Sequence, residues 1–202
     1  MRQTFLICMI LLFIALTTHF AYATNLVFNG NFELPGFSVP NYYRYLGNGD
    51  STTMQGWIVS DDGQGEASYL MHRTGYSGVY EGTYSLSLNQ GSSIRTTFST
   101  IANVSYRLSF YAAISNHAMA TPMKVKIGTN VATFSQTGIQ TYEFTAATTN
   151  SSTLLEFIND GPLGDFKIHL LDDISIVQTP EATTTLSLLL GIALAFGFMK
   201  KK

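Results

Sequence analysis

Short runs in which apolar and polar residues alternate constrain this chain more than any other feature. Tyr84 to Leu88 places an apolar or aromatic residue at every second position, and the pattern recurs at Ile94 to Phe98 and at Tyr106 to Phe110. Successive side chains of a β-strand point to opposite faces, so a period of two predicts strands with one buried face. The runs lie about ten residues apart, with turn residues between them and no helical period. The sequence therefore predicts an all-β fold, a two-sheet antiparallel β-sandwich or jelly roll.

The first 23 residues have the order of a secretory signal peptide. Met1-Arg2 carries positive charge, Phe5 to Leu16 is apolar, and Ala21 and Ala23 form a cleavage site before Thr24. An uncleaved N-terminal anchor is the alternative. The only cysteine lies inside this segment, so the cleaved chain would have no thiol for a disulfide or a metal site.

Residues 179–202 have the order of a second targeting segment, at the C-terminal end of the chain. A short box, 179–182, precedes the uncharged segment 183–199 and a basic end made of Lys200, Lys201 and Lys202. A helix over the apolar part would be roughly 21 to 27 Å long, which is marginal for a hydrocarbon core of about 30 Å. We expect a C-terminal transmembrane helix with its lysines on the cytoplasmic side. A buried core helix is the alternative.

The order of box, apolar segment and basic end resembles the PEP-CTERM sorting signal of Gram-negative bacteria. Pro180 and Glu181 match two of the three box positions, and Ala182 stands where the second proline is usual. The resemblance implies that the exported chain is held at the inner membrane through its C-terminal helix. It further implies recognition by an exosortase, cleavage near the box, and delivery to the cell surface or the extracellular space.

Between the two signals, residues 24–178 are long enough for one domain with its own core. This segment holds seven basic and twelve acidic residues, a net charge of −5. A nucleic-acid partner is disfavoured, because a phosphate backbone requires clustered positive charge. Abundant Ser, Thr, Asn, Gly and Tyr suit an extracellular β-domain with a hydroxyl-rich surface.

The order of several features along the domain resembles a galactose-binding-like jelly roll, and within that fold the DUF642 group. The features are Asn25 to Glu33, Gly56-Trp57, Glu81 to Leu88, Arg95 to Phe98 and Leu171 to Ile176. The resemblance implies a β-sandwich that binds polysaccharide and has no catalytic apparatus of its own.

Jelly rolls of this kind commonly hold a structural calcium ion where the first and last strands meet. The resemblance places that site at Glu33 and Asp172, with Asp173 as a further ligand. Carboxylates and main-chain carbonyls are the ligands that Ca²⁺ takes. The alternative is that Asp172 and Asp173 are solubilising charges at a strand edge.

Sugar binding requires flat aromatic faces beside hydrogen-bonding groups, because a pyranose presents an apolar face ringed by hydroxyls. The segment Leu34 to Gln55, which we expect to be a long loop, is rich in such groups. The predicted carbohydrate-binding residues are Tyr42, Tyr43, Arg44, Tyr45 and Trp57. For Trp57 a core anchor is the alternative, and the tyrosines could instead pack to hold the loop down.

Signs of catalysis are weak. No pair among the three histidines that follow the signal peptide has the spacing of metal ligands. Glu81, Glu143 and Glu156 are the carboxylates that could pair for glycoside hydrolysis, which leaves a minor enzymatic alternative. The sequence thus favours an exported, surface-sorted, non-catalytic protein that binds extracellular or cell-wall polysaccharide. The alternative function is a structural matrix protein that acts through self-association or protein partners.

Overall fold

The computed structural model describes residues 24–36, 42–61, 68–72, 80–114, 122–147, 152–161 and 169–179. The predicted signal peptide with Ala21 and Ala23, and the sorting residues Pro180, Glu181 and the three terminal lysines, lie outside these ranges. Within the described ranges, no helix is long and apolar enough to cross a membrane.

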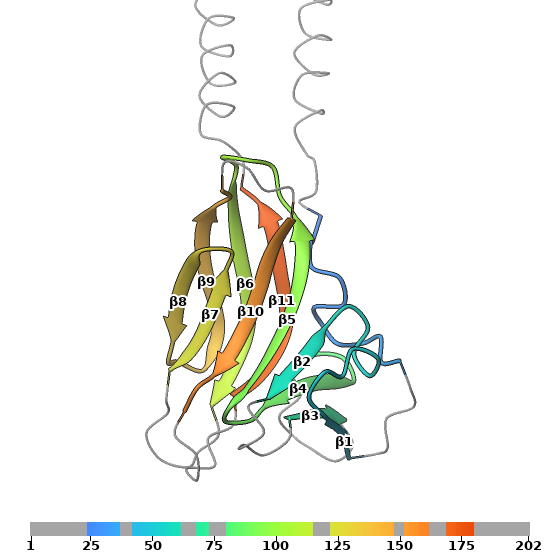
Figure 1. Ribbon diagram of the computed structural model, residues 1–202. Helices are drawn as coiled ribbons and strands as arrows, with labels where there is room; N and C mark the ends of the chain where they lie inside the picture. Colours follow the sequence, from blue (N-terminus) through green and yellow to red (C-terminus); the bar gives the residue numbers. More distant parts are fainter. Residues whose placement is uncertain are drawn as a thin grey trace, which may run out of the picture.

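The described residues form eleven strands in two sheets, and every pair of neighbouring strands is antiparallel (Figure 1). The six-stranded sheet has the order β1-β3-β4-β11-β6-β9, and the five-stranded sheet has the order β2-β5-β10-β7-β8. The strands are β1 (Tyr43–Leu46), β2 (Ile58–Asp61), β3 (Ser68–His72), β4 (Tyr84–Leu88), β5 (Ser92–Ser99), β6 (Ser105–Ile114), β7 (Met123–Ile127), β8 (Asn130–Phe134), β9 (Gly138–Thr145), β10 (Ser152–Asn159) and β11 (His169–Gln178).

The core lies between the inner faces of the two sheets. Phe110 of β6 meets Phe157 of β10 edge to face at 5.0 Å between ring centroids, and Phe98 of β5 meets Phe144 of β9 at 6.2 Å. All four rings are buried, and each buried side chain of this size stabilises the fold by about 1.5 to 3 kcal/mol. These contacts confirm the prediction of an all-β, two-sheet antiparallel fold. Because both sheets and the core lie within 24–179, we expect this segment to fold independently.

The alternation in β5 shows how the sequence positions side chains on the two faces. Ile94, Thr96 and Phe98 are buried, whereas Arg95 and Thr97 are exposed. The same alternation in β10 leaves Leu154 and Glu156 on the outer face of the five-stranded sheet. Residues on that face come together through the register of the strands, Glu156 lying opposite Arg95.

Two segments differ from the prediction. The expected loop from Leu34 to Gln55 contains β1, because Tyr43 to Leu46 pairs in register with β3. The start of the domain, Asn25 to Glu33, was expected to begin with a short apolar strand, and the structure forms no strand there. There the Leu26 amide donates to the Ile176 carbonyl, and the Asn25 side chain adds bonds to the Ile174 carbonyl and the Ile176 amide of β11, so a side chain supplies part of the pairing.

Candidate functional site

The tyrosines of β1 are prominent on the surface of the six-stranded sheet. β1 is an edge strand, and Tyr42 just before it and Tyr45 within it are 63% and 59% exposed. Tyr43 lies edge-on to Tyr45, with 5.3 Å between ring centroids. A hydrogen bond with the Tyr45 side chain raises the pKa of the Tyr43 hydroxyl, with smaller contributions from charge interaction and burial. The strand thus supplies aromatic rings with hydroxyls at their tips.

Arg44 does not share the face of its two neighbours in β1. Successive strand residues point to opposite sides, and Leu46, two positions after Arg44, is fully buried. Arg44 therefore lies on the side of Leu46, whereas Tyr43 and Tyr45 face outward. Of the predicted set, the structure therefore brings Tyr43 and Tyr45 together on one face, leaves Tyr42 exposed just before the strand, and places Arg44 on the other face.

Trp57 lies in the core. It is 1% exposed, its indole Nε1 donates a hydrogen bond to the Asn29 carbonyl at 3.0 Å, and its ring contacts Phe32 and Phe157. No face of the indole is open to a sugar in this arrangement. Trp57 is therefore a core anchor, which was the alternative to a sugar platform. The candidate carbohydrate surface consists of the tyrosines alone.

A second aromatic pair stands on the same outer face. Tyr80 stacks on Tyr111 of β6 with 4.0 Å between ring centroids and 12° between ring planes, and Tyr80 is 41% exposed. Tyr111 was not predicted, although it follows the core residue Phe110 and therefore takes an outward position in β6. Four strand steps separate β1 from β6 in the sheet, which corresponds to about 19 Å.

Glu33 and Asp172 converge on one segment at the start of β4. Glu33 Oε1 accepts hydrogen bonds from the amides of Thr83 and Tyr84 at 2.6 and 2.9 Å, and Asp172 Oδ2 accepts from the Glu81 amide at 3.2 Å. The two carboxylates come from the first turn and the last strand. They therefore tie both ends of the domain to the same backbone segment.

Burial dominates the electrostatics of Asp172. The residue is 1% exposed, and desolvation raises its carboxyl pKa to about 6 although the amides of Glu81, Asp173 and Tyr80 bond it. Asp173 is exposed at an irregularity in β11, with a φ of 48°.

The predicted calcium ion would take about six to eight oxygen ligands. Within the described ranges, no group of three or more His, Cys, Asp or Glu side chains is placed to hold a metal ion. Glu33 and Asp172, with main-chain carbonyls of the neighbouring segment, are the donors that would have to hold the ion. The calcium site stays a prediction.

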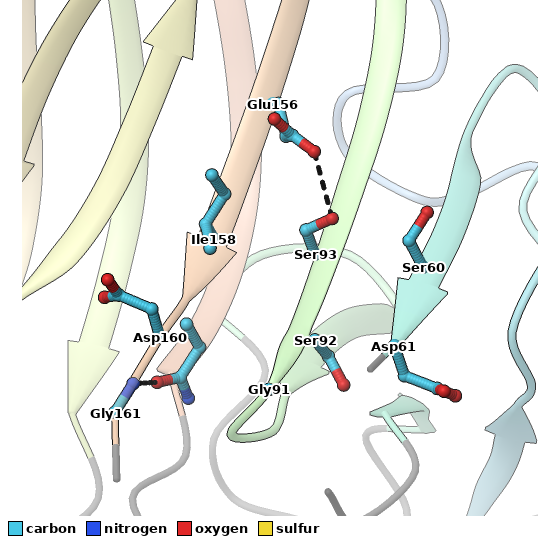
Figure 2. Close-up of a pocket in the computed structure, with 10 residues that line it drawn as sticks. Ser60, Asp61, Gly91, Ser92, Ser93, Glu156, Ile158, Asp160 and Gly161 are labelled. Atoms are coloured by element: carbon cyan, nitrogen blue, oxygen red, sulfur yellow. Dashed lines mark hydrogen bonds between the residues drawn. The ribbon is translucent and has the colours of Figure 1, made fainter. Parts of the chain in front are cut away.

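A pocket of about 370 Å³ opens at one end of the five-stranded sheet (Figure 2). It lies where β2 and β10 end and β5 begins, and three acidic side chains and three serines line it. The lining residues are Ser60, Asp61, Gly91, Ser92, Ser93, Glu156, Ile158, Asn159, Asp160 and Gly161. Apart from Glu156, which was considered only as a possible catalytic carboxylate, none of them was predicted as a site residue, because they come from three separate parts of the chain.

Two of the three carboxylates considered for glycoside hydrolysis, Glu143 and Glu156, are separated by the fold. Glu143 of β9 lies on the six-stranded sheet, 3.6 Å from the Arg107 side chain. Glu156 of β10 lies on the outer face of the five-stranded sheet, within 3.4 Å of Lys126. The core separates these two residues, so they do not form a pair.

The two sheets and their aromatic outer face define a β-sandwich domain, a fold shared with solved structures of different activities. One is the Stig cyclase Fisc from Fischerella sp. TAU, at 15% identity and a TM-score of 0.56, covering 78% of this chain and 98% of that one. Another is TmCBM61 in complex with β-1,4-galactotriose, at 15% identity and a TM-score of 0.51, covering 78% of this chain and all of that one. At such identity the likeness concerns the fold alone.

The sequence identifies the family more narrowly. Residues 25–177 match the family described as protein of unknown function (DUF642), and the chain belongs to that family. Among curated proteins, none matches the sequence.

Proposed function

We propose that this protein is an exported, surface-sorted, non-catalytic protein that binds extracellular or cell-wall polysaccharide. The observation that carries the proposal is the exposure of Tyr42 and Tyr45 beside Tyr43 at an edge of the six-stranded sheet. Large aromatic residues at such exposure have no packing role for their open faces. A pyranose ring stacks on such a face while its hydroxyls bond nearby polar groups.

The second tyrosine pair supports an extended ligand. Tyr80 and Tyr111 lie on the same outer face as β1, about 19 Å away across the sheet. Two aromatic positions at that separation suit a chain of several sugar units better than a single sugar. The shared fold with a galactotriose complex agrees with this ligand class.

Glycan-array binding of the purified 24–178 domain tests the proposal. We expect binding to at least one polysaccharide or oligosaccharide, and loss of that binding in the triple variant Tyr42→Ala, Tyr43→Ala, Tyr45→Ala. A matched variant, Tyr142→Phe, changes a half-buried tyrosine that packs against the core and should bind as the wild type does. Unchanged binding by the triple variant would refute the assignment to β1.

A matrix role through self-association is the second candidate, and the sheet edges favour it. β8 and β9 are edge strands, and they carry Val131 at 57% and Ile139 at 66% exposure. An edge strand with apolar side chains is a template for pairing with another chain. Sedimentation of the same domain distinguishes the two: a monomer with glycan hits supports the first function, and self-association without hits supports the second.

The remaining parts of the proposal concern location and metal. The chain is held at the inner membrane by its C-terminal segment until an exosortase-type enzyme cleaves near Pro180-Glu181, and the domain then reaches the cell surface.

A Ca²⁺ ion held by Glu33 and Asp172 would stabilise the closure of the two chain ends, because both carboxylates already meet at the Glu81–Tyr84 segment.

A further inference from the structure

We propose that the pocket at the end of β2, β5 and β10 is a second saccharide site, which takes a single neutral sugar unit. It lies on the five-stranded sheet, away from the tyrosines of β1 on the other sheet. Its volume of about 370 Å³ falls within the range of about 300 to 1,000 Å³ typical of small-molecule sites. The site would make the domain bivalent for glycans and goes beyond the proposed function of the tyrosine surface.

The strand register builds the pocket from two rows of residues. Ser60 lies opposite Ser93, which lies opposite Ile158; these residues face outward. One position along, Asp61 pairs with Ser92. Because side chains alternate, Ser92 points to the inner side at the end of the sheet. The pocket therefore wraps around the sheet end and is lined by polar groups from both faces.

Among the residues that line the pocket, Ser92 carries a buried hydroxyl without a described partner, a state that Ser85 Oγ and Gln90 Nε2 outside the lining share. Ser92 is 1% exposed, and its Oγ has no hydrogen-bond partner among the described residues. Leaving a buried hydroxyl without a partner is costly, so such groups are rare unless they serve a purpose. Figure 2 shows Ser92 and Asp61 beside each other where β5 and β2 meet. A sugar hydroxyl, which both donates and accepts, is a suitable partner for Oγ.

The rest of the pocket is held rigidly. The Asn159 side chain donates to the Leu88 carbonyl at 3.0 Å and accepts from the Gly161 amide at 3.3 Å. The Gly91 amide donates to the Asn159 carbonyl at 2.8 Å, which closes the turn into β5. A frame fixed in this way orders few groups when a ligand binds, and this lowers the entropic cost of binding.

The charges of the lining select a neutral ligand. Glu156 accepts from Ser93 at 3.1 Å and lies 3.4 Å from Lys126, and Asp160 pairs with Lys124. With Asp61 the lining holds three carboxylates and no basic residue, and the two lysines that pair with Asp160 and Glu156 lie outside it, so an acidic lining faces the ligand and disfavours an anion. Ile158 is the large apolar side chain of the lining, and no aromatic ring is present in it. Recognition thus depends on hydrogen bonds to hydroxyls, and a flat apolar ligand would lack a stacking partner.

Saturation-transfer NMR with free monosaccharides tests the proposal on the full chain, purified in a detergent without a sugar headgroup. We expect saturable transfer to at least one of D-galactose, D-glucose and D-mannose, with a dissociation constant on the order of 1 to 10 mM. D-galacturonate should bind more weakly than D-galactose. Absence of transfer to all three neutral sugars, or equal binding of the uronate, would overturn the proposal.

Variants test whether the saturation-transfer signal comes from the pocket. Ser92→Ala should weaken binding about 2- to 10-fold without loss of folding, because it removes a hydroxyl that has no described partner. Ser60→Phe should abolish binding by filling the pocket from a half-exposed position. Ser99→Ala, an exposed serine on the same strand outside the pocket, is the matched control and should bind normally.

The β1 variant separates this site from the proposed function. Tyr42→Ala with Tyr45→Ala should leave the monosaccharide signal intact while it reduces binding to the glycan array. If the signal is lost in the tyrosine variant and kept in Ser92→Ala, the pocket is not the site, and the tyrosine surface alone binds sugar.

Discussion

The buried carboxyl of Asp172 should make the domain less stable as the pH rises from about 4 to about 7 when no cation is bound. An acid whose pKa is raised in the folded state keeps its proton where the unfolded chain has already lost it. Stability from this group is therefore full below the unfolded pKa of 3.8 and is lost as the pH rises towards and past about 6. This is the reverse of the behaviour of a carboxylate held in a salt bridge.

The size of the effect follows from the difference between the two pKa values. A difference of about two pH units, at about 1.4 kcal/mol each, gives a loss of about 2 to 3 kcal/mol between pH 4 and pH 7. That is a large share of the free energy of unfolding of about 5 to 15 kcal/mol typical of a domain.

Urea unfolding in a chelator measures the effect, with the fluorescence of Trp57 as the probe, because this single tryptophan is buried. The Asp172→Asn variant cannot titrate at this position. The difference in unfolding free energy between wild type and variant should therefore change by about 2 to 3 kcal/mol across the pH range. Glu143→Gln, which removes an exposed carboxylate on β9, is the control. A difference between wild type and Asp172→Asn that stays constant with pH would refute the reasoning.

Three further outcomes are expected. At pH 7, calcium in place of chelator should raise the midpoint of thermal unfolding of the wild type but not of Glu33→Gln; equal midpoints for the wild type would contradict the calcium proposal. Gly82→Ala should lower the free energy of unfolding by about 1 to 3 kcal/mol in chemical denaturation, because the residue has a φ of +66° and an added Cβ would overlap Glu33 Oε1. The control Gly47→Ala, at a residue with open space around it, should change that free energy by less than about 0.5 kcal/mol. Mass spectrometry of the protein from the cell surface should find a chain that ends near the box, and recovery of an intact Lys202 there would indicate a permanent anchor instead.

Local patterns in the sequence were sufficient for much of the fold. The alternation in Tyr84 to Leu88 and in Ile94 to Phe98 depends only on the pleat of a single strand, so it is visible without any knowledge of strand partners. The tyrosines around β1 were likewise picked out without knowledge of strand partners, from composition alone. Tyr42 and Tyr45 are exposed, and the part of these tyrosines in carbohydrate binding stays a prediction.

Other features depend on which strand lies beside which. β1 was expected to be loop because Pro35, Pro40 and several tyrosines interrupt any clear period, and only its register with β3 makes it a strand. Trp57 could have been a sugar platform or a core anchor. Its burial is decided by the Asn29 carbonyl and the Phe157 ring, which are remote in sequence.

The chemistry of the strands was thus set by local sequence, and the sites were set by pairing between distant segments. Alternation fixes which face of a strand is apolar, since each side chain direction follows from its neighbour. It does not fix which strands are adjacent, because that choice depends on the packing of the whole core. For this reason Ser60, Ser92 and Glu156, which are ordinary strand residues in the sequence, come together as a pocket only in the folded sheet. Likewise, Glu33 and Asp172 meet at one backbone segment only after the two ends of the domain have joined.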